Sequence, residues 1–125
     1  FGQIVGKYIA IQTISSSGKS GMTLYRKSDG QKIKTITSNC SYYEFIDNTF
    51  YYVEPIAEFK YKIKSYNIEK KKTITYGTIK ANEFGAITSK YLYYSNGPMI
   101  GECKYYKYSF AKKKSIRITE EAFQY

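Results

Sequence analysis

Residues 50–53, Phe50-Tyr51-Tyr52-Val53, decide how this sequence folds, because all four side chains are apolar or aromatic. A strand with one face in water alternates polar and apolar residues, whereas a continuous apolar run is typical of a strand covered on both faces. The composition, with 16 Tyr and 7 Phe and no Trp, also favours strands. The stretch therefore predicts a β-strand between two other layers, with its tyrosines in the core and not on a ligand platform.

The same kind of stretch occurs twice more in the chain, and we expect Tyr93 and Tyr94, like Tyr51 and Tyr52, to pack between repeats. Tyr8-Ile9-Ala10-Ile11 lies 41 positions before Thr49-Phe50-Tyr51-Tyr52, and Tyr91-Leu92-Tyr93-Tyr94 lies 42 positions after it. Two further sets keep these offsets: Tyr25, Tyr66 and Tyr108, and Ile33, Ile74 and Ile116. A fixed period of this size indicates a repeat architecture. We therefore divide residues 1–125, taken as one all-β domain, into three copies, residues 1–41, 42–82 and 83–125.

Each copy is expected to form four antiparallel strands, because turn signals recur every 8 to 12 residues. In the second copy the expected strands are residues 42–46, 49–53, 61–68 and 73–79. Pro55 and Pro98 are interpreted as strand terminators, with a loop over residues 55–60. Ser28-Asp29-Gly30 predicts a hairpin turn in the first copy, and Ser95-Asn96-Gly97-Pro98 is expected to end the second strand of the third copy.

Three segments together carry a resemblance to a known family. They read GKYIAI…LYRKSDGQKIKTIT, NTFYYVEP…KIKSYNIEKKKTIT and KYLYYSNGP…YYKYSFAKKKSIRIT. This pattern resembles the blades of WD-repeat-like β-propellers, especially the Tyr-rich secreted propellers of bacteria. The resemblance implies a partial β-propeller that serves as a binding or scaffolding module, in an extracellular or cell-surface location; a cytoplasmic location is also compatible.

Three blades are fewer than the four to eight that close a propeller ring. We therefore expect either a piece of a longer chain that holds further blades, or a protomer that completes a ring with a second copy. The β-trefoil is the alternative fold, because it also has twelve strands in three units of about this length. It would imply a lectin-like carbohydrate-binding domain, and a third alternative is an accessory propeller domain of an enzyme whose catalytic part lies elsewhere.

Catalytic chemistry has little support in the residues. The absence of His excludes a nucleophile–histidine pair, and no glycine-rich phosphate-binding motif is present. Glu54 and Glu58 share a loop, but we interpret them as solvated charges and not as a hydrolytic pair. Cys40 and Cys103 have no metal-ligand spacing and fall at different points of the repeat, so they are expected to be free thiols. We expect no enzyme activity, no cofactor and no metal.

Charge is the most informative feature for function, since 20 Lys and Arg against 10 Asp and Glu give a net charge of +10. In a four-stranded blade the first and third turns lie at one end. That end holds Lys7, Lys27, Lys32, Lys70, Lys71, Lys72, Lys90, Lys112, Lys113 and Lys114 against Asp29, Asp47 and Glu69. The other end holds Lys19, Lys60 and Lys80 against Glu54, Glu58, Glu83, Glu102, Glu120 and Glu121. The domain is therefore expected to be electrically two-sided.

The partner is expected to be a protein or a glycan, and an anionic polymer or membrane surface is a further candidate. The candidate polyanion-binding residues are Lys70, Lys71, Lys72, Lys90, Lys112, Lys113 and Lys114. Sequence-specific nucleic-acid recognition is not expected, because Arg26 and Arg117 are the only arginines and lysine binds phosphate as a point charge. The simpler interpretation is that these lysines only keep the surface soluble.

Overall fold

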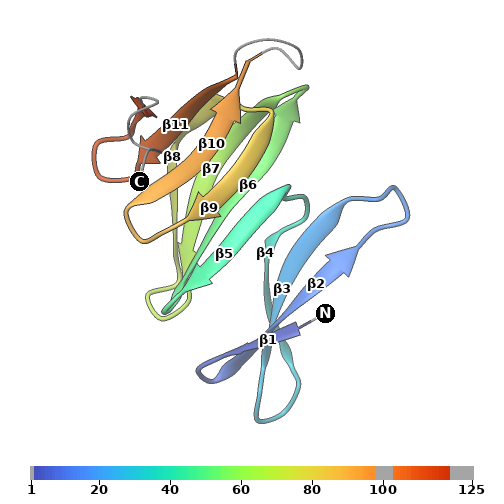
Figure 1. Ribbon diagram of the computed structural model, residues 1–125. Coiled ribbons are helices and arrows are strands. Elements are labelled where there is room, and N and C mark those ends of the chain that lie inside the picture. Colours follow the sequence, from blue (N-terminus) through green and yellow to red (C-terminus); the bar gives the residue numbers. More distant parts are fainter. Residues whose placement is uncertain (1, 98–102, 119–125) are drawn as a thin grey trace.

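The computed structural model describes residues 2–97 and 103–118, and these residues form twelve β-strands in three antiparallel sheets (Figure 1). The first sheet contains β1 (Gly2–Val5), β2 (Tyr8–Ile14), β3 (Ser20–Arg26) and β4 (Lys32–Thr37). The second contains β5 (Tyr42–Ile46), β6 (Thr49–Ala57), β7 (Lys60–Asn67) and β8 (Lys72–Lys80). The third contains β9 (Glu83–Ile87), β10 (Tyr91–Asn96), β11 (Lys104–Ser109) and β12 (Lys114–Ile118). The predicted all-β class and the four-stranded repeats are confirmed.

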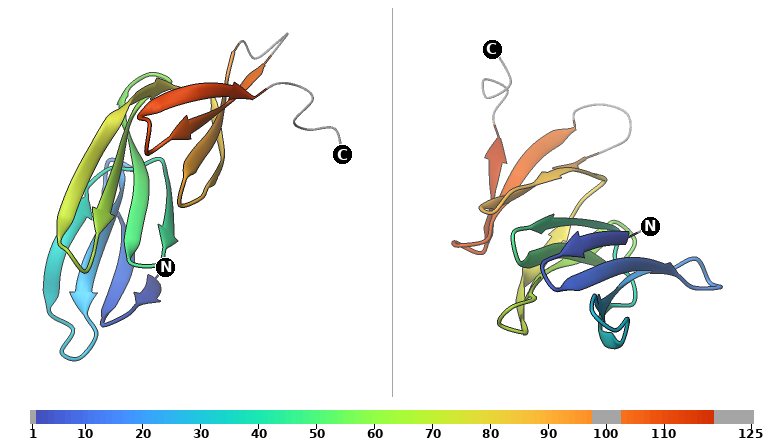
Figure 2. Two further views of the ribbon diagram at one scale, coloured as in Figure 1. Left: turned by 90° about the vertical axis from the view of Figure 1, so that its left-hand side faces the viewer. Right: turned by 90° about the horizontal axis from the view of Figure 1, so that it is seen from below.

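Each sheet is a simple meander in which every strand pairs with its neighbours in the chain. Figures 1 and 2 show the three sheets one after another, without closure into a ring. The first strand of the second sheet, β5, contacts the first strand of the third sheet, β9. The result is an open, partial propeller-like arrangement.

One backbone hydrogen bond recurs in all three sheets and joins the first turn to the third turn. In it, the residue after the third strand donates its N–H to the carbonyl of the residue before the second strand. The pairs are Lys27 with Lys7 at 2.9 Å, Ile68 with Asn48 at 2.8 Å and Phe110 with Lys90 at 3.2 Å. Both turns of a sheet are therefore held together at the same end.

The core consists of two clusters, one on each side of the second sheet. The first contains Val5, Ala10, Met22, Leu24, Cys40, Phe50, Tyr52, Tyr66 and Ile68. The second contains Val53, Ile63, Ile79, Ala81, Ile87, Leu92, Tyr94, Tyr108 and Phe110. Strand β6 supplies both, because Phe50 and Tyr52 enter the first while Val53 enters the second and Tyr51 packs against it. The expectation that this strand is covered on both faces is confirmed.

The expectation that Pro55 ends its strand is wrong, because β6 continues to Ala57. Pairing with β5 stops at Val53, so β6 is unpaired on that side when it reaches Pro55. The register with β7 also shifts between Pro55 and Ala57. A proline without an N–H donor is tolerated at an edge or a bulge, and this position offers both. Pro98 lies outside the described residues, and β10 ends at Asn96.

The expectation that Tyr93 packs between two repeats is also wrong. Its neighbours Leu92 and Tyr94 are buried in the second cluster, so strand alternation turns Tyr93 to the opposite face of the third sheet. There it is half-buried and makes an edge contact with Tyr91 at 6.0 Å between ring centroids. Tyr51, by contrast, does pack between repeats, because it stacks on Phe110 of the third sheet at 4.7 Å.

Candidate functional site

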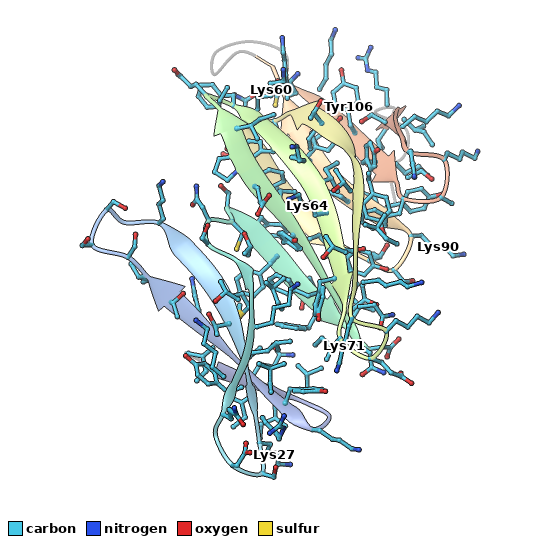
Figure 3. The ribbon with its side chains drawn as sticks, turned by 180° about the vertical axis from the view of Figure 1, so that it is seen from behind. Lys27, Lys60, Lys64, Lys71, Lys90 and Tyr106 are labelled. Carbon is cyan, nitrogen blue, oxygen red and sulfur yellow. The ribbon has the colours of Figure 1, made fainter. Side chains whose placement is uncertain are left out.

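The seven candidate lysines lie in or beside three turns at the equivalent end of two sheets, and all are exposed. We call them the basic set: Lys70 and Lys71 in the β7–β8 turn, Lys72 at the start of β8, Lys90 in the β9–β10 turn, Lys112 and Lys113 in the β11–β12 turn, and Lys114 at the start of β12. In Figure 3, Lys71 and Lys60 lie at opposite ends of the second sheet.

The β7–β8 and β11–β12 turns are built alike. Asn67 Oδ1 accepts a hydrogen bond from the backbone N–H of Lys70 at 2.9 Å. Ser109 Oγ accepts one from the N–H of Lys112 at 3.1 Å. Such side-chain acceptors at the end of a strand favour a tight turn. The two lysine triplets are therefore presented on turns of the same construction.

The middle lysine of each triplet has a left-handed backbone. The φ angle is 55° at Lys71 and 53° at Lys113, and the first sheet has Gly30 at the equivalent position with a φ of 71°. Glycine adopts this conformation readily, whereas for other residues the left-handed backbone costs about 1–2 kcal/mol of conformational free energy. Two of the three copies therefore carry a positive charge at a position where glycine would be more stable.

The positive charges of the basic set are not neutralised within the described chain. None of its lysines takes part in an ion pair there, since the described pairs are Arg26 with Asp29 and Lys64 with Glu54. At the equivalent end of the first sheet, the Gln31 N–H and the Arg26 guanidinium hold the pKa of Asp29 below its usual value. An anionic partner would therefore meet uncompensated lysines.

The structure brings part of the basic set together and keeps the rest apart. The carbonyl of Lys90 accepts the N–H of Phe110, which places Lys90 beside the turn that holds Lys112 and Lys113. The Lys70 to Lys72 triplet belongs to the second sheet, and in Figures 1 and 2 its turn is well separated from the β11–β12 turn. The basic set thus forms two groups on successive sheets.

The interpretation of Glu54 as a solvated loop charge is wrong, because Glu54 lies half-buried on β6 and has two side-chain partners. Its Oε1 pairs with Lys64 Nζ at 2.8 Å, and its Oε2 accepts a hydrogen bond from Thr37 Oγ1 at 2.6 Å. Because Thr37 ends β4 while Glu54 and Lys64 lie on β6 and β7, these contacts join the first two sheets. Glu58 lies exposed in the β6–β7 turn.

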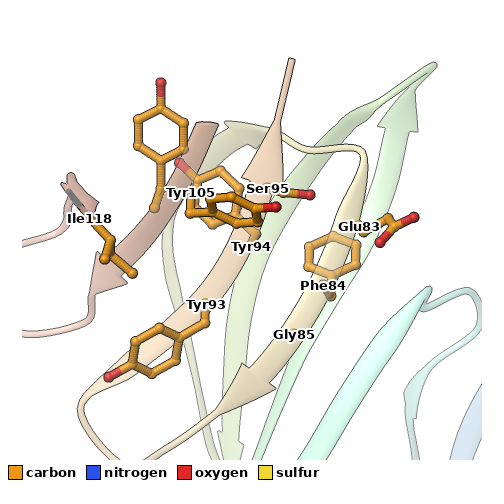
Figure 4. A pocket seen from close by; sticks show the side chains of 9 residues that line it. Glu83, Phe84, Gly85, Tyr93, Tyr94, Ser95, Tyr105 and Ile118 are labelled. Carbon is orange, nitrogen blue, oxygen red and sulfur yellow. The ribbon is translucent and has the colours of Figure 1, made fainter. Parts of the chain in front are cut away.

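A shallow pocket of about 200 Å³ was not foreseen from the sequence (Figure 4). It is lined by Glu83, Phe84, Gly85, Tyr93, Tyr94, Ser95, Tyr105, Tyr106 and Ile118. The sequence contains one signal for this pocket, which is a change of residue type at one repeat position. Met22 and Ile63 occupy that position in the first two copies, and Tyr105 occupies it in the third. The pocket lies at the far end of the third sheet from the basic set, between the first residue of β9 and the last residues of β10 and β12.

Both cysteines are free thiols, as predicted. Burial, with a smaller effect of the Glu54 carboxylate, raises the pKa of the Cys40 thiol to about 11. A thiol that stays protonated at neutral pH is a poor nucleophile and a poor metal ligand. Cys40 is therefore a packing residue of the first cluster.

Comparison of the chain with protein-family models, with curated proteins and with solved structures finds no match. Over residues 2–97 and 103–118, no helix is long and apolar enough to cross a membrane. Over the same residues, no group of three or more Cys, Asp and Glu side chains is arranged to hold a metal ion.

Proposed function

We propose that this chain is a non-catalytic, propeller-type binding module that attaches to an anionic glycan through its basic set. One observation carries the proposal: seven exposed lysines occupy equivalent turns of two sheets and have no ion pair within the described residues. The repeat architecture supports a scaffolding role, because it presents the same turn at successive sheets.

Lysine suits a partner with many weakly organised negative charges. Its ammonium group is a strongly hydrated point charge on a flexible stem, and it does not impose the planar geometry of a guanidinium. Binding through such groups is expected to be loose and sensitive to salt, because exposed charges are screened beyond about 8–10 Å at physiological ionic strength. The basic set therefore favours an anionic polymer over a small ligand.

The separation of the two lysine groups favours a flexible chain over a flat surface. The β7–β8 and β11–β12 turns lie at different levels of the stack in Figures 1 and 2. A polysaccharide can bend to contact both groups, whereas a planar membrane meets both only if no other part of the molecule projects beyond the plane that touches them. For the same reason we propose an acidic glycan and not a lipid surface as the partner.

Retention on immobilised heparin tests the proposal. One variant changes Lys112, Lys113 and Lys114 to Ser, and the control variant changes Lys19, Lys60 and Lys80, at the opposite end of the sheets, to Ser. Both lose three positive charges, so they differ only in where the charge is removed. The first should elute at clearly lower salt than the native chain, and the control should elute close to it.

Equal elution of the two variants would contradict the proposal, since net charge alone would then explain retention. Circular dichroism and thermal melting accompany the measurement, because a misfolded variant would also lose retention. Vesicles of anionic lipid serve as the competing surface. Stronger retention on vesicles than on heparin would indicate that the partner is an anionic membrane surface and not a glycan.

A further inference from the structure

The two outer faces of the stack are mainly apolar. On β2, Ala10 is buried toward the second sheet, so its neighbours Ile9 and Ile11 turn to the outer face of the first sheet. Ile4 and Tyr25 pair with Ile9 and lie on that face too. On the third sheet, the same alternation and pairing place Tyr91, Tyr93, Tyr105, Ile116 and Ile118 on the outer face. Lys107 lies among them, because it pairs with Tyr93 and Ile116, and its Nζ sits over the Tyr91 ring.

The repeat shows what normally covers such faces. Met22, Ile63 and Tyr105 occupy one repeat position, and their exposed fractions are 2%, 1% and 49%. The first two are covered by the following sheet, and the third has no following sheet among the described residues. Likewise Phe50 and Leu92 are fully buried against the preceding sheet, while their equivalent Ile9 is only half-buried. Each outer face thus keeps most of the apolar positions of an internal interface, and the exception on the third sheet is Lys107, which takes the repeat position of the buried Leu24 and Ser65.

The internal interfaces also define which residues would meet. Between the second and third sheets, Tyr51 stacks on Phe110 at 4.7 Å. The equivalent pair between the first and second sheets is Ala10 and Ile68, both buried in the first cluster. In the first copy of the repeat, the residue equivalent to Ile68 and Phe110 is Lys27. If the series continues into another chain, Tyr93 therefore packs against Lys27 of that chain. The next contact in the series is therefore a tyrosine ring facing an ammonium group.

A lysine over a tyrosine ring is an attractive contact, and two occur among the residues that the structure describes. Lys34 Nζ lies 5.1 Å from the centroid of the Tyr66 ring, and Lys107 Nζ lies 4.5 Å from that of Tyr91. The exposed Lys27 is thus a suitable partner for Tyr93 of another copy. The rest of the contact would bury isoleucines of the first sheet against aromatic residues of the third and against the alkyl stem of Lys107, whose ammonium group already lies over the Tyr91 ring.

We propose that two copies of this chain dock head to tail, the outer face of each third sheet on the outer face of the other copy's first sheet. Two such contacts close a ring of about six sheets, which is within the range of closed propellers. A head-to-tail contact forms a ring when its rotation closes and a filament when it does not. The proposal is independent of glycan binding, because a monomer could still bind heparin.

Sedimentation equilibrium of the native chain is the first test, and it should give the mass of a dimer. Because each copy has a net charge of +10, added salt should strengthen the association by screening repulsion while the apolar contact persists. This dependence is opposite in sign to that expected for heparin binding. The failure of one proposal is therefore distinguishable from the failure of the other.

Two variants test the head-to-tail geometry. Tyr93→Glu places a carboxylate in the third-sheet face, and Ile9→Glu places one in the first-sheet face. Each should raise the dimer dissociation constant by about 100-fold or more, since both contacts of the ring would bury an unpaired charge. A 1:1 mixture should recover a weaker heterodimer, because one of the two contacts then joins unaltered faces. Ile74→Glu, at an exposed isoleucine on β8 of the middle sheet, is the control and should leave the dimer intact.

A native monomer at high concentration, an open-ended series of larger species, or a dimer that only one of the two face variants disrupts would each overturn the proposal. Thermal melting checks that the variants fold. If Ile9→Glu unfolds the chain, Ile4→Glu takes its place, because Ile4 is 64% exposed and lies on the same face.

Discussion

Two buried tyrosine hydroxyls in the second cluster have opposite environments. The Tyr108 hydroxyl is buried without a hydrogen-bond partner among the described residues, and it lies 2.9 Å from the point where a side chain on Gly77 would begin. The Tyr94 hydroxyl, by contrast, bonds Ser115 Oγ at 2.5 Å. A buried polar group costs free energy unless it is hydrogen-bonded, so the two hydroxyls should contribute to stability with opposite sign.

Tyr108→Phe should raise the free energy of unfolding by about 1 kcal/mol, because it removes a hydroxyl that is desolvated without compensation. Tyr94→Phe should lower it by a similar amount, since it removes a bond and leaves Ser115 unpaired. Urea denaturation of the two variants, fitted with a common slope, provides the comparison. A loss of stability in Tyr108→Phe would show that its hydroxyl has a partner in solution.

Cys40 predicts how stability depends on alkaline pH. Its pKa is raised from 9.0 to about 11, so the folded state holds its proton where the unfolded state has lost it. The unfolded state then binds fewer protons, and stability should fall as pH rises from about 9 to 11. Burial also raises the pKa of Tyr52 and Tyr94, which adds a further loss above pH 10.

A Cys40→Ala variant should lose less stability than the native chain between pH 8 and pH 11, as measured by denaturant midpoints. Labelling with a thiol reagent at neutral pH is the companion experiment. Cys40 should react only after unfolding. Rapid labelling of Cys40 in the folded chain would show that the first cluster opens more easily than its burial implies.

At the scale of single elements, the β7–β8 and β11–β12 turns hold lysine where glycine is the less strained residue. Lys71→Gly should therefore raise the free energy of unfolding by about 0.5–1 kcal/mol, as should Lys113→Gly. The reverse change in the first sheet, Gly30→Lys, should lower it by a similar amount. Lys70→Gly, at a neighbouring position for which no left-handed angle occurs, is the control and should not stabilise the chain.

The strands themselves could be predicted closely, because aromatic and β-branched residues alternate with clear turn signals. The expected strand over residues 42–46 coincides with β5. The end of β6 was misplaced at Pro55, since the sequence does not show that β5 starts opposite Val53 and leaves an edge there. Pairing between strands, and not local propensity, therefore decided that boundary.

At the scale of the whole molecule, the burial of a repeat position depends on whether another sheet follows. Tyr93 was predicted to be in the core because its repeat equivalent Tyr51 is flanked on both sides, and repeat logic does not indicate which copy is last in the stack. The lysine turns were predictable, because the meander fixes which turns share an end. The spacing between the two lysine groups was not, since it depends on how one sheet is rotated against the next.

The same truncation at two tyrosines should therefore have unequal effects. Tyr52→Ala should cost about 3–5 kcal/mol, because Tyr52 is fully enclosed between the first two sheets. Tyr93→Ala should cost clearly less in the monomer, since one side of its ring is uncovered. Thermal melts at low protein concentration make the comparison, and equal losses would place Tyr93 in a closed core.

The central functional claim is that the basic set binds an anionic glycan, and it is tested most directly by the Lys71→Gly/Lys113→Gly double variant. Titration with heparin over a range of salt concentrations should show weaker binding and a shallower salt dependence than for the native chain. The same variant should be at least as stable as the native chain, which excludes misfolding as the cause. A Lys19→Ser/Lys60→Ser variant, which also loses two charges, should bind like the native chain. Unchanged affinity and salt dependence in the glycine variant would contradict the claim.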